Sequence, residues 1–284
     1  GIYVNYQLVQ GAMRMKVPFG IAQIGKAFRN EIVARNFIFR TREFEQMEMQ
    51  YFVKPGTDDD ILQEWKEKRF RFYPNKLGVD ESKIRFHEHG KTELAHYAKE
   101  AWDIEYEFPF GWSEIEGIHN RTDFDLSQHE TFSGKKLQYF DQQENSRFLP
   151  YIIETSAGLN RMLLTVLSDA FWEDTENNRI VLKLHPRIAP VKAVICPLIK
   201  KEGLPEKART IVDGLKPHFK VLYDQQGSIG KRYYRQDEAG TPFGITVDHQ
   251  SMEDDSVTIR DRDTQEQTRI SSDQILNFIR DKMD

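Results

Sequence analysis

The chain has 284 residues, of which 39% are hydrophobic and 12% aromatic, and this is enough for two domains with buried cores. No apolar run approaches the ~20 residues of a membrane-spanning helix. The single cysteine excludes a disulfide framework and a cysteine-based zinc site. The net charge of −5 argues against a protein that coats nucleic acid nonspecifically. We therefore expect a soluble protein of a reducing compartment, the cytoplasm, with no membrane partner.

The first candidate site lies on two strands and a loop that the sequence predicts within residues 20–52, after an ordered segment at residues 2–6. Side chains alternate across a strand, so one face is expected to carry Arg40, Arg42, Phe44, Gln46 and Glu48. Arginine forks suit phosphate, an aromatic plane suits a base, and a carboxylate suits an ammonium group. The pattern predicts a face that holds a nucleotide beside an amino compound. A charged, solvated sheet face is the alternative.

The middle of the chain predicts helices and further strands. Three acids at Asp58–Asp60 precede an apolar pattern and indicate the start of a helix, and a second helix is predicted over Thr92–Trp102. Alternating apolar residues then predict antiparallel strands, at Ile104, Tyr106 and Phe108 and at Trp112, Ile115 and Ile118. The histidines of this half lack metal-ligand spacing and are interpreted as structural or surface residues: His87, His89, His96, His119 and His129.

The second candidate site is a strand that leads into a helix at residues 152–164. Strand alternation places Glu154 and Ser156 on one face, and Gly158 permits a sharp turn. The predicted helix has an apolar side made of Leu159, Met162, Leu163, Val166, Leu167 and Ala170, and it ends near Trp172. Arg161 lies in its first turn, where both the guanidinium and the helix dipole favour a phosphate. The alternative is an ordinary surface arginine.

A polar segment without periodicity at residues 173–178 predicts a domain boundary. Beyond it, strands are predicted at Val191–Cys196, Phe219–Tyr223 and Phe243–Val247, with a helix at Glu206–Leu215. This alternation favours an α/β domain with a mainly parallel sheet. Gly227–Lys231 lacks the spacing of a phosphate loop, and a loop-to-helix turn is expected there.

Two basic clusters could contact RNA locally or could simply be solvated helix faces. They consist of Lys66, Lys68, Arg69 and Arg71, and of Lys231, Arg232 and Arg235.

Together, the two candidate sites resemble motifs 2 and 3 of class II aminoacyl-tRNA synthetases. Phe28–Glu31 matches the Phe-Arg-x-Glu strand of motif 2, and Gly158–Arg161 matches the Gly-Leu-x-Arg start of the motif 3 helix. The amino-acid sequence is more similar still to that of the glycyl-tRNA synthetases, over essentially the whole chain. The segments that carry this likeness are Glu43–Glu48, Leu94–Ala98, Tyr106–Glu114 and Asn120–Leu126.

The resemblance implies an α+β catalytic core with an antiparallel sheet at residues 1–175, followed by an α/β anticodon-binding domain at residues 180–284. It implies catalytic roles for Arg29 and Arg161, which would hold the α- and γ-phosphates of ATP. Glu114 would reach Mg²⁺ or ATP. The implied ATP site comprises Arg29, Asn30, Glu31, Phe39, Arg40, Thr41, Arg42, Glu43, Phe44, Glu114, Ile115, Gly158, Leu159, Asn160 and Arg161. The implied glycine site comprises Phe44, Glu45, Gln46, Met47, Glu48, Glu154, Thr155, Ser156, Ala157 and Gly158.

The function implied by the resemblance is that of an ATP-dependent glycine–tRNA ligase with tRNA(Gly) and glycine as substrates and a homodimeric full-length form. Motif 1 and an Arg-Pro-Glu-Thr-Ala-Gln stretch of the family are not found in these residues, so a C-terminal fragment with uncertain activity of its own is expected. A noncatalytic accessory subunit with the same fold is the alternative, but such relatives usually lose the phosphate arginines. A synthetase for another small amino acid is disfavoured by Glu48, Glu154 and Ser156.

Overall fold

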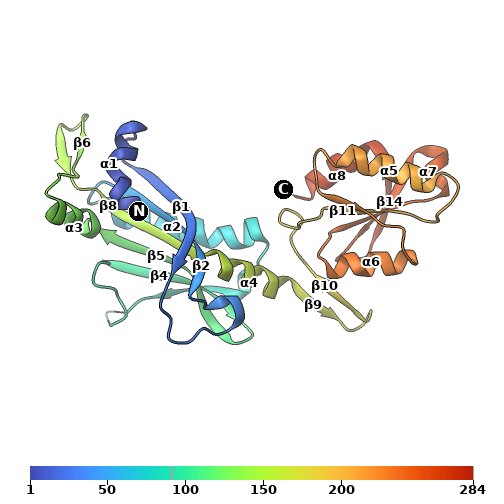
Figure 1. Ribbon diagram of the computed structural model, residues 1–284, viewed down its shortest axis with the longest axis horizontal. Coiled ribbons are helices and arrows are strands. Elements are labelled where there is room, and N and C mark those ends of the chain that lie inside the picture. Colours follow the sequence, from blue (N-terminus) through green and yellow to red (C-terminus); the bar gives the residue numbers. More distant parts are fainter. Residues whose placement is uncertain (91, 284) are drawn as a thin grey trace. The chain divides into compact units, whose positions relative to one another are not determined.

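The computed structural model describes residues 1–90 and 92–283, which form two compact units (Figure 1). The first unit comprises residues 1–75 and 80–165, and the second comprises residues 76–79 and the chain from Val166 onwards. Across the described residues, no helix is both long enough and apolar enough to span a membrane.

The first unit is built on a six-stranded sheet in the order β1-β2-β8-β5-β4-β3, in which every neighbouring pair is antiparallel. The predicted antiparallel core is therefore confirmed. Figure 1 shows β8 lying beside β2, although the chain passes through several other elements between them. The strands are β1 (Phe19–Phe28), β2 (Glu43–Val53), β3 (Ile84–Glu88), β4 (Glu100–Phe108), β5 (Gly111–Thr122) and β8 (Tyr151–Gly158).

Helices and a small hairpin complete this unit. Tyr6 of α1 stacks on Phe19 and packs at a tilt against Phe52, in a cluster at one end of the sheet. The remaining elements are α1 (Ile2–Ala12), a 3₁₀ helix (Phe37–Phe39), α2 (Asp58–Phe72), a π-helical turn (Tyr73–Leu77), a second 3₁₀ helix (Glu81–Lys83), α3 (Phe124–Ser133), β6 (Tyr139–Asp141) and β7 (Ser146–Phe148).

The two faces of the sheet differ in what covers them. Helix α2 packs against β5 and β8, and its buried Asp58 accepts a hydrogen bond from Asn120 of β5. The buried Tyr73, in the π-helical turn that follows α2, donates to Glu116 of the same strand. Because side chains alternate, the neighbouring β5 residue His119 points to the opposite face. That opposite face also carries Glu154 and Ser156, as the sequence predicts, and it holds the candidate site.

The loop before β2 differs from its prediction. Strand β2 begins only at Glu43, so Arg40 and Arg42 do not continue the strand face of Phe44. The left-handed backbone of Asn36, with φ of 56°, and the following 3₁₀ turn fold the loop back, so that Arg35 and Arg40 pair through their backbones. The two arginines are therefore placed by loop geometry and not by strand alternation.

The predicted helix at Thr92–Trp102 is wrong. Its first half forms separate turns, with backbone bonds such as Ala98 N–H to Ala95 O, and its second half enters β4. The backbone N–H of Lys99 donates to the carbonyl of Asn120 on β5, where the strand pairing starts. Pairing with a neighbouring strand outweighs a weak local helix preference.

The predicted motif 3 helix is present as α4 (Leu159–Ala170), and it follows β8 with no intervening residue. Gly158 does not have a left-handed backbone, so the turn needs no special conformation at this glycine. Met162 and Ala170 are buried, whereas Leu163 and Leu167 of the predicted apolar side are 52% and 37% exposed. The apolar face predicted for this helix is thus only partly covered within the described residues.

The second unit contains a five-stranded sheet in the order β12-β11-β13-β14-β15. Strands β12, β11 and β13 are parallel, but β14 and β15 join antiparallel, so the predicted mainly parallel sheet is mixed. A hairpin of β9 and β10 occupies the predicted polar boundary. The elements are β9 (Phe171–Asp174), β10 (Arg179–Leu182), β11 (Ala193–Pro197), α5 (Leu204–Leu215), β12 (Val221–Tyr223), α6 (Ile229–Glu238), β13 (Phe243–Val247), α7 (His249–Asp254), β14 (Ser256–Asp261), β15 (Gln267–Ser271), a 3₁₀ helix (Ser272–Gln274) and α8 (Ile275–Asp281).

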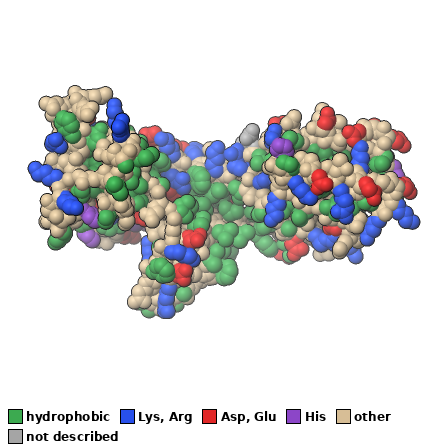
Figure 2. Space-filling view, turned by 45° about the horizontal axis from the view of Figure 1, so that its top comes forward, with side chains coloured by type: hydrophobic (Ala, Val, Ile, Leu, Met, Phe, Trp, Pro, Cys, Tyr) green, Lys and Arg blue, Asp and Glu red, His purple; other side chains and the backbone are tan. Residues whose placement is uncertain are grey.

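The two predicted basic clusters are largely engaged within the protein. On α2, Lys66 is buried over the Trp102 ring, and Arg69 and Arg71 form ion pairs with glutamates. In the second cluster Arg232 is buried. On the visible surface of the second unit, at the right of Figure 2, basic and acidic side chains are interspersed. Neither cluster is a continuous basic face.

A buried ionic network ties the hairpin to α6 and β14. Asp237 on α6 accepts hydrogen bonds from Arg179 at 2.6 Å and from Arg260 at 2.9 Å, and all three side chains are at most 5% exposed. Arg179 also donates to Asp174 at 2.7 Å.

Replacing Asp237 with alanine is expected to lower the free energy of unfolding by about 3–5 kcal/mol, because two guanidinium groups lose a buried counter-charge. Urea denaturation followed by circular dichroism measures this. Asp213→Ala, which breaks an exposed pair with Lys216, is the control and should change little. Equal effects of the two changes would contradict the proposed importance of the network.

Candidate active site

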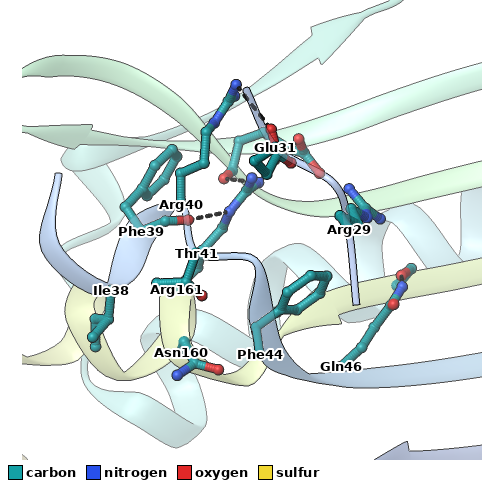
Figure 3. A pocket seen from close by; sticks show the side chains of 13 residues that line it. Arg29, Glu31, Ile38, Phe39, Arg40, Thr41, Phe44, Gln46, Asn160 and Arg161 are labelled. Carbon is teal, nitrogen blue, oxygen red and sulfur yellow. Dashed lines mark hydrogen bonds and ion pairs between the residues drawn. The ribbon is translucent and has the colours of Figure 1, made fainter. Parts of the chain in front are cut away.

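A hollow with about 500 Å³ of empty space, which includes the solvent at its mouth, lies on the sheet face opposite α2 (Figure 3). Its walls come from the loop before β2, from β2 itself, from β5, and from the junction of β8 with α4. Segments more than a hundred residues apart in the chain therefore meet there. The residues that line it are Arg29, Glu31, Ile38, Phe39, Arg40, Thr41, Phe44, Gln46, Glu114, Ser156, Gly158, Asn160 and Arg161.

Arg161 is held at one side of the hollow by the loop and by β5. Its Nε donates to the carbonyl of Phe39 at 3.1 Å, and its guanidinium carbon lies 4.4 Å from the centre of the Phe39 ring. An Nη1 nitrogen is 3.0 Å from the Glu114 carbonyl and 3.1 Å from its carboxylate. Asn160 accepts the backbone N–H of Glu45 at 2.9 Å and joins α4 to β2. The guanidinium is thus fixed before any ligand binds.

Arg29 lies at the other side of the hollow and is less constrained. Its guanidinium carbon is 5.3 Å from the centre of the Phe44 ring, and its side chain has no ion pair with the described residues. Figure 3 shows Arg29 and Phe44 on one side and Arg161 on the other. An exposed arginine beside a half-buried aromatic ring suits a phosphate attached to a base.

Two loop arginines are arranged around Glu31. Arg40 is 3.8 Å from the Glu31 carboxylate, and Arg42 Nε donates to the Glu31 carbonyl at 3.0 Å. The buried Nε of Arg40 has no hydrogen-bond partner among the described residues. An unsatisfied buried donor is costly, so an acceptor supplied by a ligand would be favourable at this wall.

A pair of carboxylates, Glu48 and Glu154, lies farther along the same sheet face. Gln50 bridges them, with its Nε2 at 2.6 Å from Glu154 and 3.4 Å from Glu48. Burial and then the charge of Glu154 raise the pKa of Glu48. Burial acts on Glu154 too, but hydrogen bonding from His119 and the charge of Arg121 outweigh it and lower the pKa of that carboxyl. The two acids therefore sit in opposite electrostatic environments.

The structure brings most of the implied ATP residues together and separates others. Gln46 and Ser156, implied for glycine, also line the hollow and bond each other at 2.6 Å. Glu48 and Glu154 lie beside it on the same face. Strand alternation turns Glu45, Met47, Thr155 and Ala157 to the opposite face, and Ile115 is buried. The implied residues that do not line the hollow are Asn30, Arg42, Glu43, Glu45, Met47, Glu48, Ile115, Glu154, Thr155, Ala157 and Leu159.

Four residues near the site were not anticipated from the sequence. Ile38 lines the hollow, and Gln50, His119 and Arg121 hold Glu154. Strand alternation from Phe44 onwards could have indicated Gln50. His119 required the register of β5 against β8, which no sequence pattern supplies.

Comparison with known families agrees with this geometry. The model of the tRNA synthetase class II core domain (G, H, P, S and T) matches residues 5–170, more than half of the chain. The chain belongs to this family. An anticodon binding domain model matches residues 192–282. The class II core with its antiparallel sheet and a following anticodon-binding domain are therefore both established for this chain.

Curated relatives named glycine–tRNA ligase are similar to this chain over nearly all of its residues. The protein of Treponema denticola is 57% identical, covering 99% of this chain and 64% of the relative. The protein of Chlorobaculum tepidum is 55% identical, over 100% of this chain and 60% of the relative. The protein of Borrelia hermsii is 55% identical, over 99% of this chain and 64% of the relative. The chain thus spans somewhat less than two thirds of these relatives.

The opposite environments of the two acids predict opposite effects on stability at pH 7. Glu48→Gln should raise the free energy of unfolding, because a carboxylate with a raised pKa is penalised in the folded state. Glu154→Gln should lower it, because its carboxylate is favoured there.

Denaturant titrations at several pH values measure both effects. The loss of unfolding free energy in Glu154→Gln should be complete above the ordinary carboxyl pKa of 4.5. It should disappear as the pH falls through the lower pKa that Glu154 has in the folded protein. Effects of the same sign at pH 7 for the two variants would contradict the assignment.

Proposed function

We propose that the protein acts as a glycine–tRNA ligase, which activates glycine with ATP and transfers it to the 3′ end of tRNA(Gly). The observation that carries this proposal is the meeting of Arg29 and Arg161 at one hollow, beside the buried carboxylate of Glu154 and the half-buried carboxylate of Glu48. Glycine–tRNA ligases are also the names of relatives at 50–57% identity. Both substrates, glycine and tRNA(Gly), belong to this proposal.

For ATP, we assign phosphate contacts to the two arginines of opposite walls. Arg29 would hold the α-phosphate and Arg161 the γ-phosphate, with adenine against the Phe44 ring. Asn30, Glu31, Arg40 and the neighbouring loop residues would close over the nucleotide. Gly158 lines the hollow, and a Cβ there would fill space toward Arg161, 3.6 Å from its Cγ.

For glycine, Glu48 is the better placed of the two carboxylates to receive the ammonium group. Glu154 is already bonded by three side chains, whereas Glu48 has, among the residues that the structure describes, only the long contact from Gln50. Ser156, which bonds Gln46, lies between this acid pair and the hollow. Alanine would be rejected by crowding, since an extra methyl forced into a filled site costs roughly 1–3 kcal/mol.

Mg²⁺ fits the chemistry of the residues at the edge of the hollow. The Glu114 carboxylate is about half exposed, and Mg²⁺ is usually held by one or two carboxylates together with substrate phosphates. We assign Glu114 as the protein ligand. When bound, the ion would offset phosphate charge during transfer.

The chemical step needs little more than placement and charge neutralisation. The glycine carboxylate oxygen forms a bond to the α-phosphorus, and the bond from that phosphorus to pyrophosphate breaks. No general base is needed, because the carboxylate is already ionised. Arg29 would stabilise charge on the α-phosphate, and Arg161 would hold the departing pyrophosphate.

The remaining features of the proposal follow the family. Residues 1–175 would form the catalytic domain and residues 180–284 the anticodon-binding domain. The full-length protein would be a cytoplasmic homodimer. A noncatalytic accessory role is disfavoured, because Arg29, Arg40 and Arg161 are all retained at the hollow.

Arg29→Ala and Arg161→Ala should each lower glycine-dependent pyrophosphate exchange by at least about a hundredfold, because each removes a charge from one end of the triphosphate. The measurement is ATP–pyrophosphate exchange by the intact gene product, with circular dichroism to verify folding.

Arg147→Ala is the matched control, since Arg147 is exposed and stacks on Phe140 of the β6–β7 hairpin. It should exchange like the parent protein. Unchanged exchange in either site variant would defeat the assignment, and an amino-acid panel in the same assay tests the choice of glycine.

A further inference from the structure

Glu154 occupies the centre of a row of polar side chains that crosses three adjacent strands. Gln50 on β2 is directly opposite Glu154, and Glu154 is directly opposite His119 on β5. All three point to the sheet face opposite α2. Gln50 Nε2 lies 2.6 Å from Glu154 Oε2, and His119 Nδ1 lies 3.1 Å from Oε1.

These contacts leave Glu154 little capacity for a further ligand. Arg121 Nη1 approaches Oε2 at 3.2 Å, so three side chains donate to a carboxylate that is only 6% exposed. A carboxylate accepts about four hydrogen bonds in all. Glu154 is therefore a fixed negative charge, whose two oxygens are held in place by its neighbours on β2 and β5.

The position of His119 is set on its other side by a glycine and a second acid. A Cβ built on Gly117 would lie 3.1 Å from His119 Nε2 and 3.6 Å from Asp103 Oδ1, so the missing side chain leaves room for the ring. Asp103 is in turn bonded by His89 at 2.8 Å. The His119 ring thus bonds the Glu154 carboxylate and lies near that of Asp103.

The hydrogen-bond direction at His119 is determined by chemistry. An ionised carboxylate only accepts, so Nδ1 must carry the proton that it shares with Glu154. No other described residue donates a hydrogen bond to Oε1. Gln50 and Arg121 both hold the other oxygen, Oε2. Without His119, the carboxylate could therefore rotate and move Oε1 out of its present position.

We propose that His119 is a positioning residue of the amino-acid pocket. By fixing Glu154 Oε1, it orients the acid pair for the ammonium group of the substrate, without touching ATP. The inference rests on the proposed function and goes beyond it, because it assigns amino-acid affinity to a histidine outside the hollow.

The experiment compares His119→Leu with His119→Asn in the intact gene product, using ATP–pyrophosphate exchange. The asparagine amide nitrogen can stand at the place of Nδ1, whereas leucine offers no donor. We expect His119→Leu to raise the KM for glycine about tenfold, the loss for a hydrogen bond to a charged group. The kcat and the KM for ATP should stay within about twofold, and His119→Asn should recover most of the affinity.

His87→Leu is the control, a histidine of edge strand β3 whose side chain is 42% exposed, and it should leave all constants unchanged. An unchanged KM for glycine in His119→Leu would overturn the inference. So would an asparagine variant as impaired as the leucine variant, or equal losses in the KM for glycine and ATP, because these indicate a merely structural role. A parent protein without glycine-dependent exchange would instead defeat the proposed function, and the inference with it.

Discussion

The antiparallel pairing of β2 with β8 is the constraint on which the site depends. Its register places Gln46 opposite Gly158 and Gln50 opposite Glu154, so residues about a hundred positions apart become neighbours on one face. A slip of one residue would turn the whole set to the other side of the sheet, toward α2. The side-chain bonds from Gln50 to Glu154 and from Gln46 to Ser156 cross this strand pair, and both would be lost in such a slip. The same bonds that fix the register thus select the face that carries the chemistry.

The site combines charged side chains that the protein holds tightly with charged side chains that it holds loosely. Arg161 and Glu154 are held by several partners each, and they act as preset charges that need no reorganisation when a ligand binds. Arg29 and Glu48 are held less tightly, and the raised pKa of Glu48 shows that its charge lacks compensation. A cationic amino group and an anionic phosphate would supply the missing partners. In the ligand-free protein, the ionised form of Glu48 is therefore disfavoured, whereas that of the neighbouring Glu154 is favoured.

The sequence predicted the parts of this site that follow from local pattern. Alternation placed Glu154 and Ser156 on one face, and the helix that begins after Gly158 was correctly anticipated. Alternation failed at Arg40 and Arg42, because the chain leaves the strand in a left-handed turn that the residue types do not announce. The helix expected at Thr92–Trp102 was wrong for another reason, since pairing with β5 is a long-range interaction. The role of His119 was invisible for the same reason, because it exists only through the register of three strands.

The central claim is that one ligand joins the two arginine-bearing walls of the hollow. The most direct test is a crystal structure of the intact gene product with ATP, glycine and Mg²⁺, or with a stable analogue of glycyl-adenylate. We expect the α-phosphate at Arg29, the γ-phosphate at Arg161 in the ATP complex, the base on Phe44 and the amino group at Glu48. A nucleotide bound elsewhere, or one that leaves Arg161 bonded only to Phe39 and Glu114, would contradict this claim.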